Sequence, residues 1–242
     1  MTLSIIIPTK NEENYLPELL KSIRMQNFPA YDYEIIVADN NSKDKTREIA
    51  KEYKCRIVKG GLPGAGRNFG AKAAKGEILL FLDADTKLLT KNFLKKSIDE
   101  FSRRRLDIAV PEAYIKGKKM DELFFESWNY LVEISQYLMP YAGGWCIFAL
   151  KEIHDKIKGF DEKIALGDDS DYAQRSSKKG KFRMLRSVKI QVSPRRFKKE
   201  GYLKVAFQAI GTGVYWAMLG KDKKNSFNYN FDIYDKKDDK NK

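Results

Sequence analysis

Residues 78–85 read Ile-Leu-Leu-Phe-Leu-Asp-Ala-Asp and join five consecutive apolar side chains to two carboxylates. An unbroken apolar run of this length is typical of a strand that helices cover on both faces, as in a parallel sheet. Asp83 and Asp85 stand two positions apart, so in an extended chain their side chains point the same way. Ligands of open α/β sheets bind beyond the carboxyl ends of the strands. The stretch therefore predicts a buried strand that carries two carboxylates to a binding edge, although Asp is also common in solvated turns.

The sequence on either side of this strand alternates short apolar runs with segments of helical spacing. Such alternation predicts right-handed βαβ units. We therefore expect an α/β fold with a mostly parallel, Rossmann-like central sheet flanked by helices. Strands are predicted at residues 3–7, 33–38, 56–58, 78–82 and 107–110, and helices at residues 14–25, 44–53, 65–74 and 92–101.

The rest of the chain has longer helical segments. Residues 221–242 are rich in Lys, Asp and Asn, so we expect a charged, flexible tail after a helical C-terminal extension. Helices are predicted at 122–138, 170–179 and 203–219, a strand at 143–150, and two short strands at 182–185 and 188–192. We expect residues 1–110 and 111–195 to form the two halves of one domain, and residues 196–220 a basic loop with an apolar-rich helix.

The composition narrows the classes of function. The 242-residue chain carries 46 Lys and Arg against 33 Asp and Glu, a net charge of +13. This excess favours an anionic partner, such as a phosphate, a nucleic acid or an acidic membrane, without choosing among them. Two widely separated cysteines and a single histidine argue against a disulfide framework and a zinc site, so we expect a cytoplasmic protein with free thiols. No uninterrupted apolar stretch reaches the ~20 residues of a membrane-spanning helix.

Polar clusters also follow the first and second predicted strands. Asp39 ends the second strand, where its carboxylate can accept hydrogen bonds from a base or a ribose. Ser42 or Asp44 behind it can simply cap the next helix. After the first strand, Asn11 and Glu12 suit a helix N-terminus. Because the first, second and fourth strands end at one edge of the predicted sheet, a binding role for these residues becomes attractive.

A glycine-rich loop, residues 60–66, leads into Arg67 and a helix. Backbone N–H groups at such a helix N-terminus suit a phosphate. The loop matches neither a P-loop nor a dinucleotide fingerprint, because no Gly-Lys-Ser/Thr follows and the first strand lacks glycines. Arg67 can pair with a diphosphate or with an acidic side chain, and we expect it to have a positioning role at a donor site.

Three carboxylates, those of Asp168, Asp169 and Asp171, crowd the start of another predicted helix. Helix capping needs one of them, and three in four positions repel one another unless a cation or a proton is near. A carboxylate held over a substrate hydroxyl is a suitable general base. A solvated, over-charged first turn is the alternative interpretation.

Taken in order, these motifs resemble the family 2 inverting glycosyltransferases with the GT-A fold. The resemblance spans about residues 1–190 and is carried by the segments 5–13, 37–46, 67–70, 76–85, 159–162 and 167–169. It implies a nucleotide-binding half, an Asp-x-Asp site for a divalent metal (Mn²⁺ or Mg²⁺), and an acceptor half with a catalytic aspartate.

The resemblance also implies roles for the matching residues. Asp169 matches the base, and Asp168 stands where the family usually has Glu, so both are candidates for the base. Asp85 would ligate the metal. An ordinary Asp pKa of ~4 would keep the base ionised at neutral pH. The residues expected at the nucleotide-sugar are Pro8, Thr9, Glu12, Asp39, Arg67 and Asp83, with Arg195 and Arg196 as candidates either for closing over the diphosphate or for an ordinary solvated loop.

The resulting hypothesis is a metal-dependent inverting glycosyltransferase that moves a sugar from a UDP- or GDP-sugar to an acceptor hydroxyl of unknown identity. The aromatic helices 122–138 and 203–219 suit either a buried core or an anionic membrane. A lipid-linked or membrane-presented acceptor, and a position at the inner face of a membrane, are therefore further expectations. A sugar-nucleotide nucleotidyltransferase is the alternative, although such enzymes usually carry a glycine-rich loop where Pro8 and Thr9 stand. A nucleic-acid partner is not expected, because the positive charge is scattered.

Overall fold

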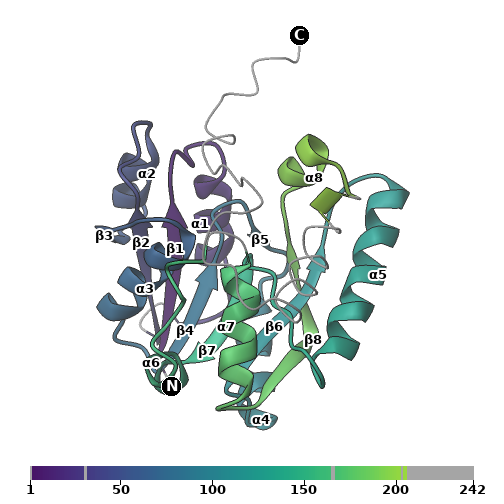
Figure 1. Ribbon diagram of the computed structural model, residues 1–242. Helices are drawn as coiled ribbons and strands as arrows, with labels where there is room; N and C mark the ends of the chain where they lie inside the picture. Colours follow the sequence, from purple (N-terminus) through teal and green to yellow (C-terminus); the bar gives the residue numbers. More distant parts are fainter. Residues whose placement is uncertain (1, 30–31, 165–166, 203, 206–242) are drawn as a thin grey trace.

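The computed structural model describes residues 2–29, 32–164, 167–202 and 204–205, and in these residues strands and helices alternate (Figure 1). The strands are β1 (Leu3–Thr9), β2 (Tyr33–Asp39), β3 (Arg56–Lys59), β4 (Ile78–Leu82), β5 (Lys87–Leu88), β6 (Ile108–Tyr114), β7 (Cys146–Leu150) and β8 (Phe182–Gln191). The helices are α1 (Leu16–Arg24), α2 (Thr46–Glu52), α3 (Pro63–Ala73), α4 (Phe93–Arg103), α5 (Lys119–Ser135), α6 (Lys151–Lys156), α7 (Asp168–Ser177) and α8 (Arg195–Glu200). The described strands form one sheet in the order β3-β2-β1-β4-β7-β6-β8-β5.

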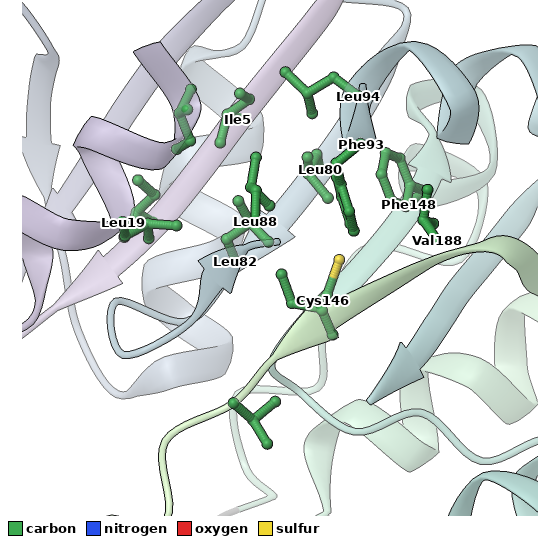
Figure 2. Packing of buried hydrophobic residues seen from close by; sticks show 14 of the residues in the cluster. Ile5, Leu19, Leu80, Leu82, Leu88, Phe93, Leu94, Cys146, Phe148 and Val188 are labelled. Carbon is green, nitrogen blue, oxygen red and sulfur yellow. The ribbon is translucent and has the colours of Figure 1, made fainter. Parts of the chain in front are cut away.

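Strands β3, β2, β1 and β4 are parallel neighbours, as predicted for the first half of the chain. Successive side chains pack on opposite faces, so that Ile5 and Leu80 join one buried cluster and Ile6 joins another. Helices α1, α2 and α4 bury apolar side chains in the first cluster, and α3, α6 and α7 in the second. Figure 2 shows the first cluster, with Leu19 of α1 and Phe93 of α4 on the same face of the sheet. The prediction of strands covered on both faces is confirmed.

The other half of the sheet adds antiparallel strands to an arrangement that is mostly parallel, with four of the seven pairings among the described strands parallel. Strand β7 runs antiparallel to both of its neighbours, β4 and β6, and β5 runs antiparallel to β8. Only β6 and β8 are parallel in this half. The sheet is therefore mixed. An apolar run predicts burial, but it carries no information about strand direction, which is why the sequence could not reveal the reversal of β7.

Two further expectations change in the C-terminal part. The two short strands predicted in residues 182–192 form the single strand β8, and the shift in its register against β6 falls between Pro111 and Glu112. The basic run at 195–200 forms the short helix α8 rather than a loop. The predicted helix 203–219, from residue 206 onward, and the charged tail 221–242 lie outside the described residues. Within the described part of the chain, no helix combines the length and apolar character needed to cross a membrane.

The single histidine, His154, lies on helix α6, which was not predicted from the sequence. His154 is 5% exposed, and its Nδ1 lies 3.2 Å from the hydroxyl of Tyr172. Its ring packs against Phe81 and Phe160. Burial lowers the pKa of His154 to about 4, because a charged imidazole is unfavourable away from water. This histidine is a neutral core residue.

Candidate active site

The carboxyl ends of β1, β2 and β4 meet at one edge of the sheet. Thr9 pairs with Asp39 at the ends of β1 and β2. At the end of β4, Leu82 pairs with Cys146, the first residue of the antiparallel strand β7. The reversal of β7 therefore brings the loop before this strand to the same edge. The backbone N–H of Asp83 donates to the carbonyl of Trp145 in that loop at 3.2 Å.

Arg67, in the second turn of α3, gathers carboxylates from two distant segments. Its Nη2 lies 2.8 Å from Oδ1 of Asp83, and its Nη1 lies 3.0 Å from Oδ2 of Asp168. Nη2 also donates to the carbonyl of Gly144 at 3.1 Å. The guanidinium is only 3% exposed. Arg67 thus pairs with acidic side chains, one of the two outcomes that the sequence left open.

The loop before β7 must carry a glycine where it passes this guanidinium. A Cβ at Gly144 would lie 2.7 Å from Nη2 of Arg67 and 3.1 Å from Oδ2 of Asp169. Any larger residue would push one of these groups away. The close approach also shows that the Asp169 carboxylate lies beside the Arg67 cluster, which we define as Arg67, Asp83, Asp168 and Asp169.

Asp169 differs from the ordinary aspartate expected from the sequence. Its Oδ1 accepts a hydrogen bond of 2.7 Å from the backbone N–H of Ser170. Burial and the neighbouring Asp168 carboxylate outweigh the attraction of Arg67 and raise the pKa of Asp169 to about 7. Burial also raises the pKa of Asp168. The expectation of a pKa near 4 is therefore wrong, because it ignored the removal of both carboxylates from water.

The third carboxylate of this segment has a structural partner. Asp171 is 1% exposed and receives a hydrogen bond of 2.6 Å from Nε of Arg175, one turn later in α7. The same guanidinium donates to the carbonyls of Ile157 and Gly159. Asp171 therefore ties α7 to the loop after α6, whereas Asp168 and Asp169 belong to the Arg67 cluster.

A second guanidinium lies at the same edge. Nε of Arg195 is 2.7 Å from Oδ2 of Asp85, and its two terminal nitrogens are 3.0 and 2.8 Å from the Glu12 carboxylate. We call these three residues the Arg195 cluster. The sheet explains this meeting, because β5, which starts two residues after Asp85, pairs with the last residues of β8, and Arg195 follows shortly after that strand. The side chain of Arg196 is not among those described.

The charged side chains of the Arg195 cluster are largely buried. Burial raises the pKa of Glu12 to about 7, against the opposing effect of Arg195. Burial likewise raises the pKa of Asp85. Two carboxylates that converge on one cation are also suitable oxygen ligands for Mg²⁺ or Mn²⁺, which need only one or two from the protein when phosphate and water supply the rest. No group of three potential metal ligands occurs in the described residues.

Asp39 lies at the end of β2 with most of its carboxylate occupied. It is 5% exposed and accepts hydrogen bonds from the hydroxyls of Thr9 at 3.3 Å and Ser42 at 2.5 Å. Nε of Arg47 lies 3.8 Å away. Pro8, another predicted donor-site residue, lies near the end of β1; it is half-buried, and a Cβ at Gly66 would lie 3.2 Å from its Cβ.

Sequence reasoning missed several residues that hold this site together. Gly144 and Trp145 carried no signal beyond a turn before a strand. The sequence assigns Ser42 only a capping role and assigns Asn68, which lies in the matching segment 67–70, no role of its own. Asn68 in fact exchanges two hydrogen bonds with the backbone of Phe160 and so fixes α3 against the loop before α7. Its position directly after the predicted donor-site arginine was the available signal.

A comparison with protein families now adds independent evidence. The model of the family described as "Glycosyl transferase family 2" matches residues 4–159, which contain Arg67, Asp83 and Asp85. The chain belongs to this family.

The chain is also similar to individual glycosyltransferases. The chain is 38% identical over 118 residues to the poly(ribitol-phosphate) β-N-acetylglucosaminyltransferase TarS of Staphylococcus aureus, a match that covers 46% of this chain and 20% of that protein. It is 26% identical over 188 residues to the glycosyltransferase AglE of Haloferax volcanii, covering 73% of this chain and 62% of AglE. The chain thus spans about a fifth of the length of the S. aureus relative.

Solved structures confirm the GT-A fold of this family member. A crystal structure of S. aureus TarS 1–349 superposes with a TM-score of 0.66 at 20% identity, covering 90% of this chain and 73% of the other. The mannosyltransferase PcManGT of Pyrobaculum calidifontis, in complex with GDP-Man and Mn²⁺, superposes with a TM-score of 0.68 at 19% identity, covering 88% and 64%. TarS 1–349 is also known in complex with UDP-GlcNAc.

Proposed function

We propose that this chain is a metal-dependent, inverting glycosyltransferase that moves a sugar from a UDP- or GDP-sugar to an acceptor hydroxyl. In this proposal residues 1–110 bind the donor and residues 111–195 bind the acceptor and supply the base. The family membership supports sugar transfer. The named complexes of structural neighbours with UDP-GlcNAc and GDP-Man support a nucleotide-sugar donor.

The Arg67 cluster is the observation that carries this proposal. One buried guanidinium holds a carboxylate from the end of β4 and another from the start of α7, 2.8 and 3.0 Å away. It thereby brings the expected sugar-binding residue, Asp83, next to the expected base, Asp169. The Nε of Arg67 is buried and has no hydrogen-bond partner among the described residues.

The donor would bind along the ends of β1, β2 and β4. Asp39 would contact the base, with Thr9 and Pro8 beside it at the end of β1. Glu12 would contact the nucleoside, and Asp83 the ribose or the sugar. Arg195 and Arg196 would turn toward the diphosphate, since a guanidinium fork matches phosphate oxygens well. Binding would therefore require Arg195 to exchange at least part of its contact with Glu12 and Asp85 for the donor.

The metal would be held by Asp85, whose carboxylate suits Mg²⁺ or Mn²⁺ together with diphosphate oxygens. When bound, such a cation neutralises negative charge on the departing nucleoside diphosphate. Arg195 and the carboxylates around it share this edge, so the protein already stabilises a cation here. Mn²⁺ in the complex of the neighbour PcManGT supports the choice of metal.

Asp169 would act as the general base. Its carboxylate takes the proton of the acceptor hydroxyl while that oxygen bonds to the anomeric carbon from the face opposite the phosphate. The bond from the anomeric carbon to the phosphate oxygen breaks, and its electron pair leaves with the nucleoside diphosphate. One displacement inverts the configuration. A base with a pKa of about 7 is well matched to neutral pH, because it is partly ionised and still a good proton acceptor.

The acceptor is proposed only by class. Among the relatives, one is named as a transferase to an undecaprenol-linked saccharide and another as a dolichol-phosphate mannosyltransferase. A lipid-linked or membrane-presented hydroxyl, reached from the cytoplasmic face of a membrane, is therefore the acceptor class that we favour.

A thermal-shift panel tests the proposal directly. The full chain is heated with UDP, GDP, UDP-sugars, GDP-sugars and ATP, each with and without Mn²⁺. We expect one uridine or guanosine series to raise Tm, and to do so more with Mn²⁺, since a ligand that binds only the folded state stabilises it. A chain that responds to none of them, or equally to ATP, would not be the proposed enzyme.

A further inference from the structure

Helix α5 carries a row of apolar side chains that point away from the protein. With about 3.6 residues per helical turn, the positions of its members lie on one side of the helix and of the turn that follows it. Leu138 is 90% exposed, Met120 is 73% exposed, and Tyr130 is 64% exposed. We call this row the outer stripe, which comprises Met120, Leu123, Tyr130, Leu131, Ile134, Tyr137 and Leu138.

The outer stripe is a local feature of this helix rather than a general property of the surface. Of the twelve large hydrophobic side chains that are exposed in the described residues, eight lie between Met120 and Met139. The opposite side of α5 is apolar as well, with Phe125 and Val132 buried in the two core clusters. Helices that are apolar on both sides are normally covered on both sides. Figure 1 shows α5 at the outer edge of the molecule, flanking β6 and β8.

Basic side chains surround the outer stripe at its N-terminal end. Lys116, Lys118 and Lys119 are exposed just before and at the start of α5. Exposed Lys198 and Lys199 lie on α8. This short helix packs against α5 through Phe197, whose ring centroid is 5.9 Å from that of Phe124 and 5.1 Å from that of Phe125.

The other end of the stripe is basic too. The guanidinium of Arg183 lies 4.7 Å from the ring centroid of Tyr137, and Arg186 is exposed beside it in β8. The acidic residues of α5 are Asp121 and Glu122 in its first turn, the exposed Glu126, and Glu133, which pairs with Arg186. Positive charge therefore exceeds negative charge around the stripe.

We propose that the outer stripe of α5 is a docking surface for an anionic lipid membrane. Apolar side chains of moderate size would enter the region between headgroups and acyl chains, the two tyrosines would lie at the headgroup level, and the lysines would face acidic headgroups. A second copy of this chain fits less well, because it would offer the same excess of positive charge to the same surface. An anionic membrane offers the opposite charge.

The stripe is also connected to the candidate active site. The chain passes from the end of α5 to Gly144, whose carbonyl accepts the hydrogen bond from Arg67. A membrane at α5 would therefore lie along the acceptor half of the molecule. That use of the surface rests on the proposed function, whereas the docking itself does not.

Vesicle flotation tests the proposal. The full chain is mixed with phosphatidylcholine vesicles or with mixed phosphatidylcholine–phosphatidylglycerol vesicles and centrifuged through a density gradient. We expect flotation with the anionic vesicles, much less with the neutral ones, and a loss at high salt, because exposed charges are screened. A triple variant of the stripe, Leu131→Gln, Ile134→Gln and Leu138→Gln, should lower the floated fraction at least about tenfold, since each change removes an apolar side chain from the interface.

A matched control changes exposed apolar residues elsewhere. Met25 and Leu89 are 50% and 40% exposed, and the double variant Met25→Gln, Leu89→Gln should float like the unchanged chain. Helical circular dichroism and an unchanged nucleotide-dependent Tm shift show that each variant is folded and that the donor site is intact.

Three results would overturn the proposal. The first is that the unchanged chain does not float. The second is that the triple variant floats as well as the unchanged chain. The third is that light scattering shows the triple variant to be a monomer and the unchanged chain a dimer, with no difference in flotation. A chain that floats as expected but binds no nucleotide would leave the docking surface in place and refute only the proposed function.

Discussion

Two arginines lie at the same edge of the sheet but differ in their exposure and in their partners. Arg67 is 3% exposed and is held by Asp83, Asp168 and the backbone of Gly144. Arg195 is 24% exposed, pairs with Glu12 and Asp85, and lies over the ring of Tyr15. Arg67 belongs to α3, which packs on the parallel half of the sheet, whereas Arg195 belongs to the short helix α8.

The difference separates a fixed cation from an exchangeable one. A guanidinium buried among two ion-pair partners cannot leave without exposing uncompensated charges, which is costly. A partly exposed guanidinium loses less, because water can replace it. We infer that Arg67 sets the geometry of the reaction and that Arg195 gives way to a donor and its metal. The predictions below test this contrast.

The largest effect is expected at the carboxylate beside Arg67. The Asp169→Asn variant should lower kcat by about 10³-fold, since an amide cannot accept the proton that a general base takes. Nucleotide binding, followed as a Tm shift, should persist. Asp171→Asn is the matched control, because Asp171 pairs with Arg175 away from the cluster, and its kcat should stay within a few-fold of the unchanged enzyme. Near-normal turnover in Asp169→Asn would exclude this residue as the base.

Removal of the fixed guanidinium should be costly for folding. Arg67→Met leaves Asp83, Asp168 and Asp169 without their shared cation, and we expect the free energy of unfolding to fall by about 3 kcal/mol. Urea unfolding at neutral pH measures this change. At lower pH the difference from the unchanged chain should shrink, because Asp168 and Asp169, whose pKa values are raised by burial, become protonated. A loss no greater than that of Arg195→Met would contradict the contrast between the two arginines.

The activity should depend on pH near neutrality. The raised pKa of Asp169, about 7, means that its carboxylate accumulates only as the pH rises through that value. The value of kcat/KM should therefore increase about tenfold between about pH 6 and about pH 8, and then level off. Initial rates over this range at constant metal concentration measure the profile. A rate that is already constant from about pH 5 upward would show that the base has an ordinary pKa.

The smallest effect is expected at the exchangeable guanidinium. Arg195→Met should change the free energy of unfolding by only about 1 kcal/mol, because Glu12 and Asp85 can take up protons or water. Mn²⁺ without nucleotide should raise the Tm of this variant more than that of the unchanged chain, since Arg195 no longer competes for Asp85. The Arg67→Met variant should show no such gain. Equal responses to Mn²⁺ in all three proteins would refute the exchange.

The sequence was a good guide wherever a signal was local. The apolar runs of β1, β2 and β4 predicted both their burial and the shared edge at which they end. The paired aspartates at 83 and 85 and the acidic segment at 168–171 were recognised from residue type and spacing. It was a poor guide to contacts between distant segments, such as the ion pair between Arg67 and Asp168, which are 101 residues apart in the chain.

Each expectation that the structure overturned depends on contacts between segments that are distant in the sequence. A buried strand such as β7 looks the same in either direction, so its reversal, and with it the position of Gly144, could not be foreseen. The pKa of Asp169 depends on burial by segments far away in the chain. Asp171 is equivalent to its neighbours in residue type and spacing, and only its ion pair with Arg175 distinguishes it.

By itself, then, the sequence determined the family, the parallel half of the sheet and the residue types at its binding edge. These follow from short-range patterns: apolar periodicity, strand-end polar residues and their order along the chain. Only the tertiary structure decided which carboxylate meets which guanidinium, that Arg67 is buried while Arg195 is accessible, and that α5 turns a second apolar side outward. Those properties arise from the packing of segments that are remote in the chain, and burial sets both the strength of the charge pairs and the pKa values of their members.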